Sequence, residues 1–363
     1  MINRRLYYRT AGQGFKRPAV FIGFMVILIW VIQIAGCASR QPASVLIEHP
    51  IATVPTTQPD RGLNLKLVTY NIWGLPSWMT GARSGRYPKI ARELERLDPD
   101  IILLQEAWTA KARESAPTNG HWSIARAAGQ HTFFQQSGLE TLSRFPIIGG
   151  EFYPFSQAAF PDRFVNKGAL KVTVQLPHGQ VLNVWNVHFQ DGGSTQLQLS
   201  QVREFLSRVQ TAKDGQIADL VGGDFNCTPD SCFYHELTNS LGPSALQRNG
   251  AAPFVTWDGL SSKPGAGQTL DYVFVRARVP SKAPQAVQQV AFAAAGFEQR
   301  LSDHFGIEAS VNLSSISQLA AATALPLQAS RLPVLAAAHG IYPGGLGKSA
   351  QPRIATKTEP HLE

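Results

Sequence analysis

The sequence predicts an α/β fold in which strands deliver polar side chains to one edge of a sheet. Apolar runs typical of strands are separated by runs with helical spacing. Polar residues recur where the strand-like runs end: Asn71, Glu106, His188, Asp224, Asn226, Asp271, Asp303 and His304. Because α/β scaffolds gather functional side chains at one edge of their sheets, this recurrence predicts a site there.

The first predicted elements are a strand, a helix and a second strand. Apolar and polar residues alternate over 64–70, which predicts a strand. Apolar residues at helical spacing predict a helix over 87–97, and Asp98-Pro99 ends it. The continuous apolar run 101–104 predicts a buried strand leading to Glu106, and this pattern is typical of a sheet covered on both faces.

The later elements are further strands and one long helix. Residues 196–210 carry one apolar stripe, which predicts the helix. Strands are predicted at 139–143, 169–175, 181–187, 217–221, 272–276 and directly after His304.

The stretch Gly222-Gly223-Asp224-Phe225-Asn226 has the composition of a ligand-binding strand end. Two glycines let the backbone turn tightly and approach a ligand closely. Asp224 and Asn226 are two residues apart, so an extended chain points both side chains to the same face. The carboxylate suits a metal or water, and the amide suits a phosphate oxygen. For an isolated motif of this kind, the alternative is a structural Asx turn.

The formal net charge of +8 is concentrated near the two ends of the chain. Residues 1–36 hold five Lys/Arg and no acid, and residues 313–363 hold four basic and two acidic side chains. Between them, residues 37–312 hold 24 basic and 23 acidic side chains. This nearly neutral middle part has no excess of positive charge of the kind that binds the phosphate backbone of a nucleic acid.

The N-terminus has the pattern of an export signal, with a basic region before an uncharged apolar run over 18–39. The run ends Ile34-Ala35-Gly36-Cys37, which resembles the lipobox of bacterial lipoproteins and implies cleavage before Cys37 and its lipid modification. The alternative is an uncleaved anchor, because about 20 apolar residues span a bilayer. Both alternatives attach the chain to a membrane outside the cytoplasm, and we expect an outer-membrane lipoprotein.

We therefore divide the chain into a signal peptide (1–36), a tether (37–62), a main domain (63–312) and a low-complexity tail (313–363). The tether is rich in Pro, Ser, Thr and Gln and sustains no hydrophobic period. The tail is rich in Ala, Leu, Ser, Pro and Gly.

Each polar strand-end residue has a structural alternative when it is taken alone. Glu106 is also typical of a helix N-terminal acid, His188 of a half-buried hydrogen-bonded histidine, and Asp303-His304 of a surface pair. Together the residues supply two histidines, several carboxylates and two amides. This set fits metal-assisted phosphoryl transfer, with oxygen ligands for Mg²⁺ and a histidine base.

The motifs around these residues resemble the endonuclease/exonuclease/phosphatase superfamily, which includes deoxyribonuclease I and the neutral sphingomyelinases. They occur in the family's order and cover about 63–312: Y-N-I-W-G-L-P, L-L-Q-E-A-W, N-V-H-F-Q, G-D-F-N, L-D-Y and L-S-D-H. The resemblance implies a four-layer sandwich of two packed mixed β-sheets flanked by helices. It also implies hydrolysis that depends on Mg²⁺, with Mn²⁺ or another divalent cation as the alternative.

The resemblance also implies a role for each site residue. Glu106 binds the metal with Asn71 close to it, and His304 is the general base. The other roles are as follows: Asp271 orients His304, Asp224 positions the water or lies near the metal, Asn226 and His188 stabilise the phosphate, and Asp303 contacts a metal ligand or a histidine.

Within the superfamily the sequence is most similar to the sphingomyelinase branch, through N-I-W-G-L-P, residues 137–147 and N-K-G-A-L. Lys167 then falls near the phosphate site. Aromatic residues at 152–155, Phe160 and Phe164 either enter a lipid interface or pack in the core. The late aromatic hairpin of the haemolytic members is missing, because residues 278–289 hold no aromatic side chain.

We accordingly expect a membrane-attached, monomeric phosphodiesterase acting on a sphingomyelin-like phospholipid. A surface nuclease with the same site and a catalytically inactive binding lipoprotein are the alternatives. Cys227 and Cys232 lie in a compartment that permits disulfides, so a short bridge after Asn226 and two free thiols are both open.

Overall fold

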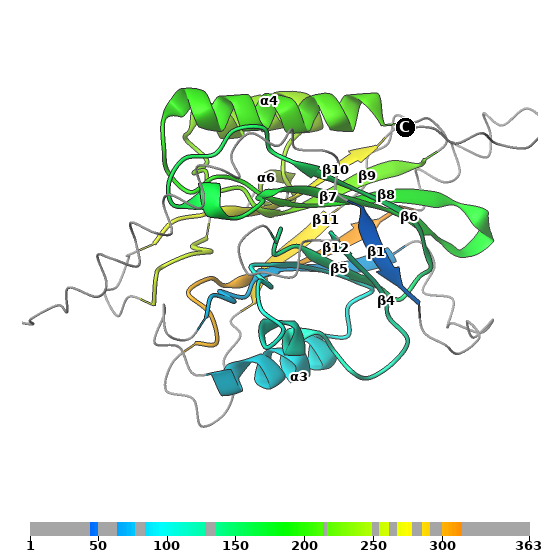
Figure 1. The fold of residues 1–363 in the computed structure, drawn as a ribbon. Helices are drawn as coiled ribbons and strands as arrows, with labels where there is room; N and C mark the ends of the chain where they lie inside the picture. The colour runs from blue at the N-terminus through cyan, green and yellow to red at the C-terminus, as the bar shows by residue number, and fades with distance from the viewer. Residues whose placement is uncertain are drawn as a thin grey trace, which may run out of the picture. The chain divides into compact units, whose positions relative to one another are not determined.

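Two β-sheets packed face to face, each covered by helices on its outer face, make up the described part of the computed structural model (Figure 1). The structure describes residues 44–49, 64–76, 84–127, 136–212, 216–248, 254–260, 267–277, 285–290 and 300–313. Cys37, the predicted signal peptide and the tail beyond 313 lie outside these residues, and so does most of the tether.

The first sheet is mixed and has seven strands among the described residues. Its strands, in spatial order, are β1 (Val45–Glu48), β4 (Ser123–Ala127), β5 (Glu140–Ser143), β3 (Ile101–Gln105), β2 (Asn64–Asn71), β12 (Gly306–Asn312) and β11 (Gln285–Val290). The β2–β3 pair is parallel and its neighbours are antiparallel.

The second sheet is built from five described strands. Their spatial order is β10 (Asp271–Ala277), β9 (Ala218–Asp224), β8 (Val181–His188), β7 (Gly168–Gln175) and β6 (Ile147–Pro154). Only β8 and β9 run parallel, among these strands.

The helices are α3 to α6, accompanied by four short 3₁₀ turns in the described part of the chain. Their bounds are α3 (Tyr87–Leu97), α4 (Thr195–Thr211), α5 (Cys232–Leu241), α6 (Ala245–Arg248), η1 (Ser84–Arg86), η2 (Ala112–Ser115), η3 (Asp162–Phe164) and η4 (Pro177–Gly179). Figure 1 shows α4 over the second sheet and α3 over the outer face of the first. Each of these two helices turns a buried stripe toward its sheet.

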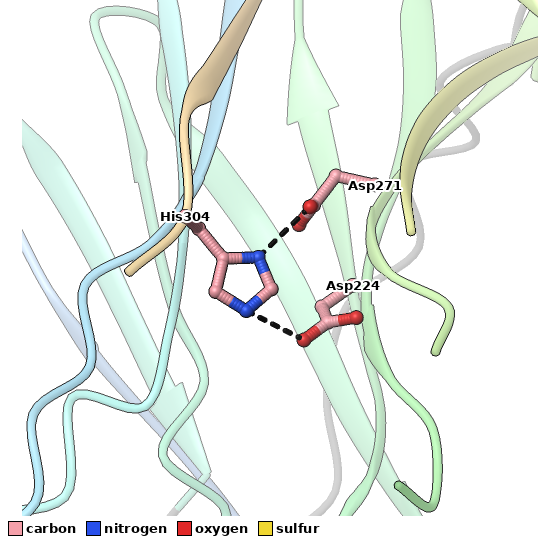
Figure 2. Close-up of side chains that lie close together, drawn as sticks. All are labelled: Asp224, Asp271 and His304. Atoms are coloured by element: carbon pink, nitrogen blue, oxygen red, sulfur yellow. Dashed lines mark hydrogen bonds and ion pairs between the residues drawn. The ribbon is translucent and has the colours of Figure 1, made fainter. Parts of the chain in front are cut away.

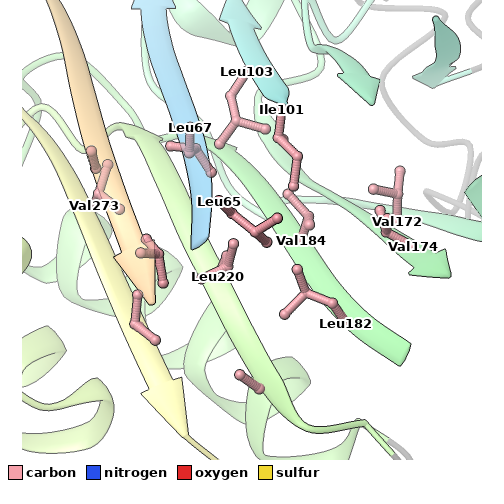
Figure 3. Packing of buried hydrophobic residues seen from close by; sticks show 14 of the residues in the cluster. Leu65, Leu67, Ile101, Leu103, Val172, Val174, Leu182, Val184, Leu220 and Val273 are labelled. Carbon is pink, nitrogen blue, oxygen red and sulfur yellow. The ribbon is translucent and has the colours of Figure 1, made fainter. Parts of the chain in front are cut away.

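Three apolar clusters fill the spaces between the layers. Alternate residues of one strand serve two of them, because successive strand side chains point to opposite faces. In β3, Ile101 and Leu103 pack between the sheets, while Ile102 and Leu104 pack toward α3. Figure 3 shows the cluster between the sheets. A third cluster joins the second sheet to α4 and α5. The predicted four-layer sandwich is confirmed.

The structure contains a strand, β1, within the segment 37–62 that was predicted to be a tether. Val45–Glu48 pair with β4 at the outer edge of the first sheet, and Val45 and Ile47 pack against the core. Four residues are too few to show a strand period, so the sequence pattern did not reveal this strand.

The described helices contain no segment with the length and apolar character needed to span a bilayer.

Candidate active site

Strand register brings the predicted site residues to one edge of the sandwich. In the second sheet, Asp271 pairs with Asp224, and Asp224 pairs with His188. In the first sheet, Asn71 ends β2 beside the last residue of β3, and Glu106 follows directly. His304 lies two residues before β12, which starts at the same edge.

The two glycines of β9 have a packing role that differs from the predicted turn. β9 continues through both of them to Asp224. A Cβ on Gly222 would lie 2.8 Å from Leu103 Cδ1 of the facing sheet, and one on Gly223 would lie 2.0 Å from Val187 O. Glycine therefore lets the two sheets and two strands approach closely where Asp224 enters the site.

His304 lies between two carboxylates, as Figure 2 shows. Its Nδ1 is 2.9 Å from Asp271 Oδ2, and its Nε2 is 3.7 Å from Asp224 Oδ2. All three side chains are buried. The short contact places the shared proton between Nδ1 and Asp271, which leaves Nε2 as the atom that exchanges a proton with a reactant.

Charge and burial shift the pKa values of this group. Burial alone would lower the pKa of His304, but the carboxylates of Asp271 and Asp224 outweigh it and raise the value to about 10. Burial, followed by repulsion from Asp271, raises the pKa of Asp224 to about 7. The cluster therefore holds protons tightly when no cation is bound.

Asn71 connects the two sheets across the site. Its Nδ2 donates to Asp224 Oδ2 at 2.9 Å and to Glu106 Oε1 at 3.2 Å. Its own Oδ1 accepts from the backbone N–H of Trp73 at 3.0 Å. The amide is thereby fixed, so the carboxylates of Asp224 and Glu106 are held close together.

Glu106 carries the feature that best fits a cation. Its Oε2 is buried and has no hydrogen-bond partner among the described residues. Burial, and after it the Asp303 carboxylate, raises the pKa of Glu106. An unpaired buried carboxylate oxygen is costly, and a bound divalent cation removes that cost. Asp224, Asp271 and His304 also lie close enough to one another to hold a metal. We favour Glu106, because the His304 nitrogen that meets Asp271 is already in a hydrogen bond.

His188 is a buried neutral imidazole at the end of β8. Burial, followed by the charges of Lys167 and His304, lowers its pKa well below 6.5. Its Nε2 is 3.5 Å from Asp224 Oδ2, and its Nδ1 is buried without a partner in the described residues. The ring centroid lies 6.2 Å from that of Trp108. A neutral ring in this position can donate a hydrogen bond without adding charge.

Asn226 and Lys167 meet at one backbone carbonyl. Asn226 Nδ2 donates to Phe189 O at 3.0 Å, and Lys167 Nζ donates to the same oxygen at 3.2 Å. The backbone N–H of Asn226 also donates to Asp224 Oδ1 at 3.0 Å. Lys167 Nζ pairs with Asp162 Oδ2 at 2.8 Å. Both predicted phosphate-binding residues thus lie beside His188.

Asp303 is half-buried and lies at the rim of the cluster. Its Oδ2 accepts from Trp257 Nε1 at 3.3 Å, and its Oδ1 accepts from Ser302 Oγ at 3.2 Å. The structure shows no direct contact between Asp303 and a histidine ring among its described interactions. Its predicted role stays a prediction.

Sequence reasoning missed the residues that fasten the site. Ser302 Oγ donates to Asn71 O at 2.8 Å and accepts from the His304 backbone N–H at 3.3 Å. Thr256 Oγ1 accepts from the backbone N–H of Asp271 at 3.0 Å. Asp162 pairs with Lys167. Ser302 stood inside the L-S-D-H motif, whereas Thr256 and Asp162 gave no signal in the sequence.

The two cysteines are free thiols in the structure, which is the second of the two alternatives left open by the sequence. Cys227 is buried and lies in the loop after β9, while Cys232 is the first residue of α5 and is exposed. Burial raises the pKa of Cys227 to about 12, so its thiol is not reactive at neutral pH.

The aromatic residues for which a lipid interface and core packing were both open differ in burial. Phe152 and Phe155 are core residues, and Phe160 is exposed.

Comparison with known proteins adds three findings. A model of the Endonuclease/Exonuclease/phosphatase family matches residues 68–304. An inositol phosphosphingolipids phospholipase C from Schizosaccharomyces pombe is 28% identical over 195 residues, which are 50% of this chain and 46% of that protein. The sphingomyelinase C of Listeria ivanovii is 22% identical over 250 residues, which are 58% of this chain and 72% of that protein.

The fold is also found among solved structures. A beta toxin from Staphylococcus aureus with bound magnesium ions has a TM-score of 0.50 and 18% identity, covering 68% of this chain and 99% of that chain. This likeness shows the fold. The chain spans about half the length of the Schizosaccharomyces pombe relative.

Proposed function

The chain belongs to the Endonuclease/Exonuclease/phosphatase family, and we propose that it is a phosphodiesterase that uses a divalent cation to hydrolyse a sphingomyelin-like phospholipid. The observation that carries the proposal is that two features lie together at one edge of the sandwich. One is the His304–Asp271 pair, and the other is the unpartnered Glu106 oxygen. The first suits proton transfer, and the second suits a cation.

In the proposed reaction His304 takes a proton from the attacking water. Asp271 accepts from His304 Nδ1 and fixes the ring, so Nε2 is the basic atom. With a pKa of about 10, the imidazole is protonated at neutral pH when no cation is present. A cation held at Glu106 would oppose that protonation and would shift the His304 imidazole toward its basic form.

The remaining side chains stabilise charge on the phosphate. His188 and Asn226 offer neutral donors and Lys167 offers a positive charge, which would stabilise the negative charge that develops on the phosphate oxygens. Asp224 is held by Asn71 and by the Asn226 backbone, so it has a fixed orientation for a water molecule. Fixed donors and acceptors contribute most because phosphoryl transfer depends on positioning.

Glu106 would hold the cation through its unpartnered Oε2, and Asn71 would hold the Glu106 carboxylate in place through its amide N–H. When bound, a divalent cation supplies Lewis-acid polarisation of a phosphate oxygen. Mg²⁺ is the first choice, because the available ligands are carboxylate oxygens. The magnesium-bound beta toxin of the same fold supports this choice.

The substrate class follows from the relatives and from the proposed lipoprotein anchor. By their names, the two curated relatives act on sphingolipids as a phospholipase C and a sphingomyelinase C. We propose that this chain is attached outside the cytoplasm to the outer membrane through Cys37. The membrane would then supply a phospholipid substrate close to the enzyme. We further propose that it works as a monomer.

A substrate panel tests the proposal. The purified full chain is incubated with sphingomyelin, an inositol phosphosphingolipid, phosphatidylcholine and plasmid DNA, each with Mg²⁺ or with EDTA. We expect Mg²⁺-dependent release of a phosphorylated head group from a sphingolipid. Cleavage of DNA without turnover of lipid would replace the lipid substrate by nucleic acid. Absence of hydrolysis in every arm would favour a binding protein.

A further inference from the structure

We propose that the edge of the sandwich that holds the site is also the face that docks on the membrane, with Phe160 inserted in the lipid surface. This inference rests on the phospholipid substrate proposed above. It is carried by the exposure of Phe160, by the attachment of its loop and by the point where the chain enters the first sheet.

Phe160 is the most exposed large apolar side chain among the described residues, at 71%. Its ring meets that of Phe164 edge to face, with centroids 5.8 Å apart. Pro161 and Arg163 beside it are also exposed. An aromatic side chain with an adjacent arginine is a combination that suits the boundary between lipid head groups and acyl chains.

The loop that carries Phe160 is fastened directly beside the site. Asp162 Oδ2 pairs with Lys167 Nζ and accepts from the Asp191 backbone N–H, both at 2.8 Å. The backbone N–H of Ala159 donates to Gln190 Oε1 at 2.9 Å. Asp191 and Gln190 follow β8, the strand that ends at His188. Phe160 is therefore held at the same edge as the catalytic residues, on a loop with little freedom to move away.

The chain enters the first sheet through its outermost strand, β1. Val45, the first residue of β1, pairs with Ala127 at the end of β4. Next in the sheet, Arg126 of β4 pairs with Glu140 of β5. Glu140 also pairs with Leu104 of β3, which lies two residues before Glu106. The start of β1 is thus level with the site end of β3.

The length of the segment between Cys37 and Val45 then limits the distance between the start of β1 and the membrane. Seven residues lie between Cys37 and Val45, so this segment, eight Cα–Cα steps long, spans at most about 28 Å when fully extended. A lipid attached at Cys37 therefore keeps the start of β1 within that distance of the bilayer. The occupant of the docking face is the lipid surface of the membrane in which the chain is anchored.

Paired variants and two substrates test the proposal in the full chain. Phe160→Ser removes the exposed aromatic side chain. Ile148→Ser is the control, because Ile148 is 55% exposed and lies at the other end of β6, where the strand begins. Each protein is reconstituted in phosphatidylcholine vesicles containing sphingomyelin and is also assayed on the soluble diester bis(p-nitrophenyl) phosphate. We expect Phe160→Ser to lower vesicle hydrolysis roughly 10-fold, as for loss of one interfacial aromatic, and to leave the soluble substrate unchanged. Ile148→Ser should change neither rate.

Equal vesicle turnover in wild type and Phe160→Ser would overturn the docking face. Loss on both substrates would also overturn it, because the side chain would then act on the fold or the site. If wild type cleaves neither substrate, the proposed function has failed, and docking is still tested by photo-crosslinking to a diazirine-bearing phosphatidylcholine. Lipid attached at 156–165 supports docking. Its absence there refutes docking.

Discussion

Buried carboxylates converge on His304 with few compensating positive charges. Asp224 and Asp271 are each 1% exposed, and each lies within 4 Å of a nitrogen of the His304 ring. Interactions between buried charges are strong, and removal of one member leaves the others uncompensated. The same residues should therefore control both catalysis and the pH dependence of stability.

Replacement of His304 tests its role as the base. His304→Ala should lower turnover at least about 10²-fold, the range expected for a lost general base. His235→Ala on the exposed face of α5 is the matched control. Steady-state kinetics with Mg²⁺ provides the measurement, and near-wild-type turnover in His304→Ala would refute the assignment.

Replacement of Glu106 tests the cation site. Glu106→Ala should lower turnover at least about 10²-fold, and should raise the Mg²⁺ concentration needed for half-maximal activity. Glu114→Ala is the control, because Glu114 forms only an exposed pair with Lys111. A Mg²⁺ titration of activity distinguishes them. An unchanged Mg²⁺ dependence in Glu106→Ala would place the cation elsewhere.

The raised pKa values predict that the metal-free protein loses stability as the pH rises. The pKa of Asp224 rises from 3.8 to about 7, so its stabilising proton is lost as the pH rises through about 7. The pKa of His304 rises from 6.5 to about 10, so its contribution is complete below about 6.5 and is lost through about 10. In EDTA the melting temperature should fall by at least about 2–4 °C from pH 6 to pH 10. A His304→Gln variant should fall less between pH 8 and pH 10, and an equal fall would contradict the assignment.

At the scale of single elements, the register of β9 depends on Gly223. Its φ of +149° and the 2.0 Å approach of an added Cβ to Val187 O exclude a side chain. Gly223→Ala should therefore lower the free energy of unfolding by about 1–3 kcal/mol and shift Asp224 in the site. Gly85→Ala is the control, because an added Cβ there meets nothing within 4 Å. Urea unfolding would show the difference, and equal stability of the two variants would contradict this role.

Local sequence patterns predicted the elements that have a sustained period. The helix predicted at 196–210 is α4, Thr195–Thr211, and the strand at 101–104 is β3 with one more residue. β6 was not predicted, because Gly149-Gly150 and a register shift near its start break the strand pattern. Contacts such as Asp162 with Lys167 also depend on how the loop folds back, which no local pattern encodes.

At the scale of the whole molecule, the order of the motifs predicted the four layers and the edge where they converge. The strand ends could be read because each polar residue directly follows or directly precedes an apolar run. The network joining Asn71 to Asp224 could not, since these residues are 153 positions apart and on different sheets. The exposure of Phe160 and the pairing of β1 with β4 likewise depend on the packed sandwich.

The most direct test of the central claim, a cation-dependent phosphodiesterase, is reversible metal removal from the full chain. Hydrolysis of bis(p-nitrophenyl) phosphate is followed with Mg²⁺, after EDTA, and after Mg²⁺ is restored, with His304→Ala as the blank. We predict that EDTA lowers the rate at least about 10²-fold and that Mg²⁺ restores it, while His304→Ala stays inactive throughout. A rate that is unaffected by EDTA, or equal in His304→Ala, would contradict the account.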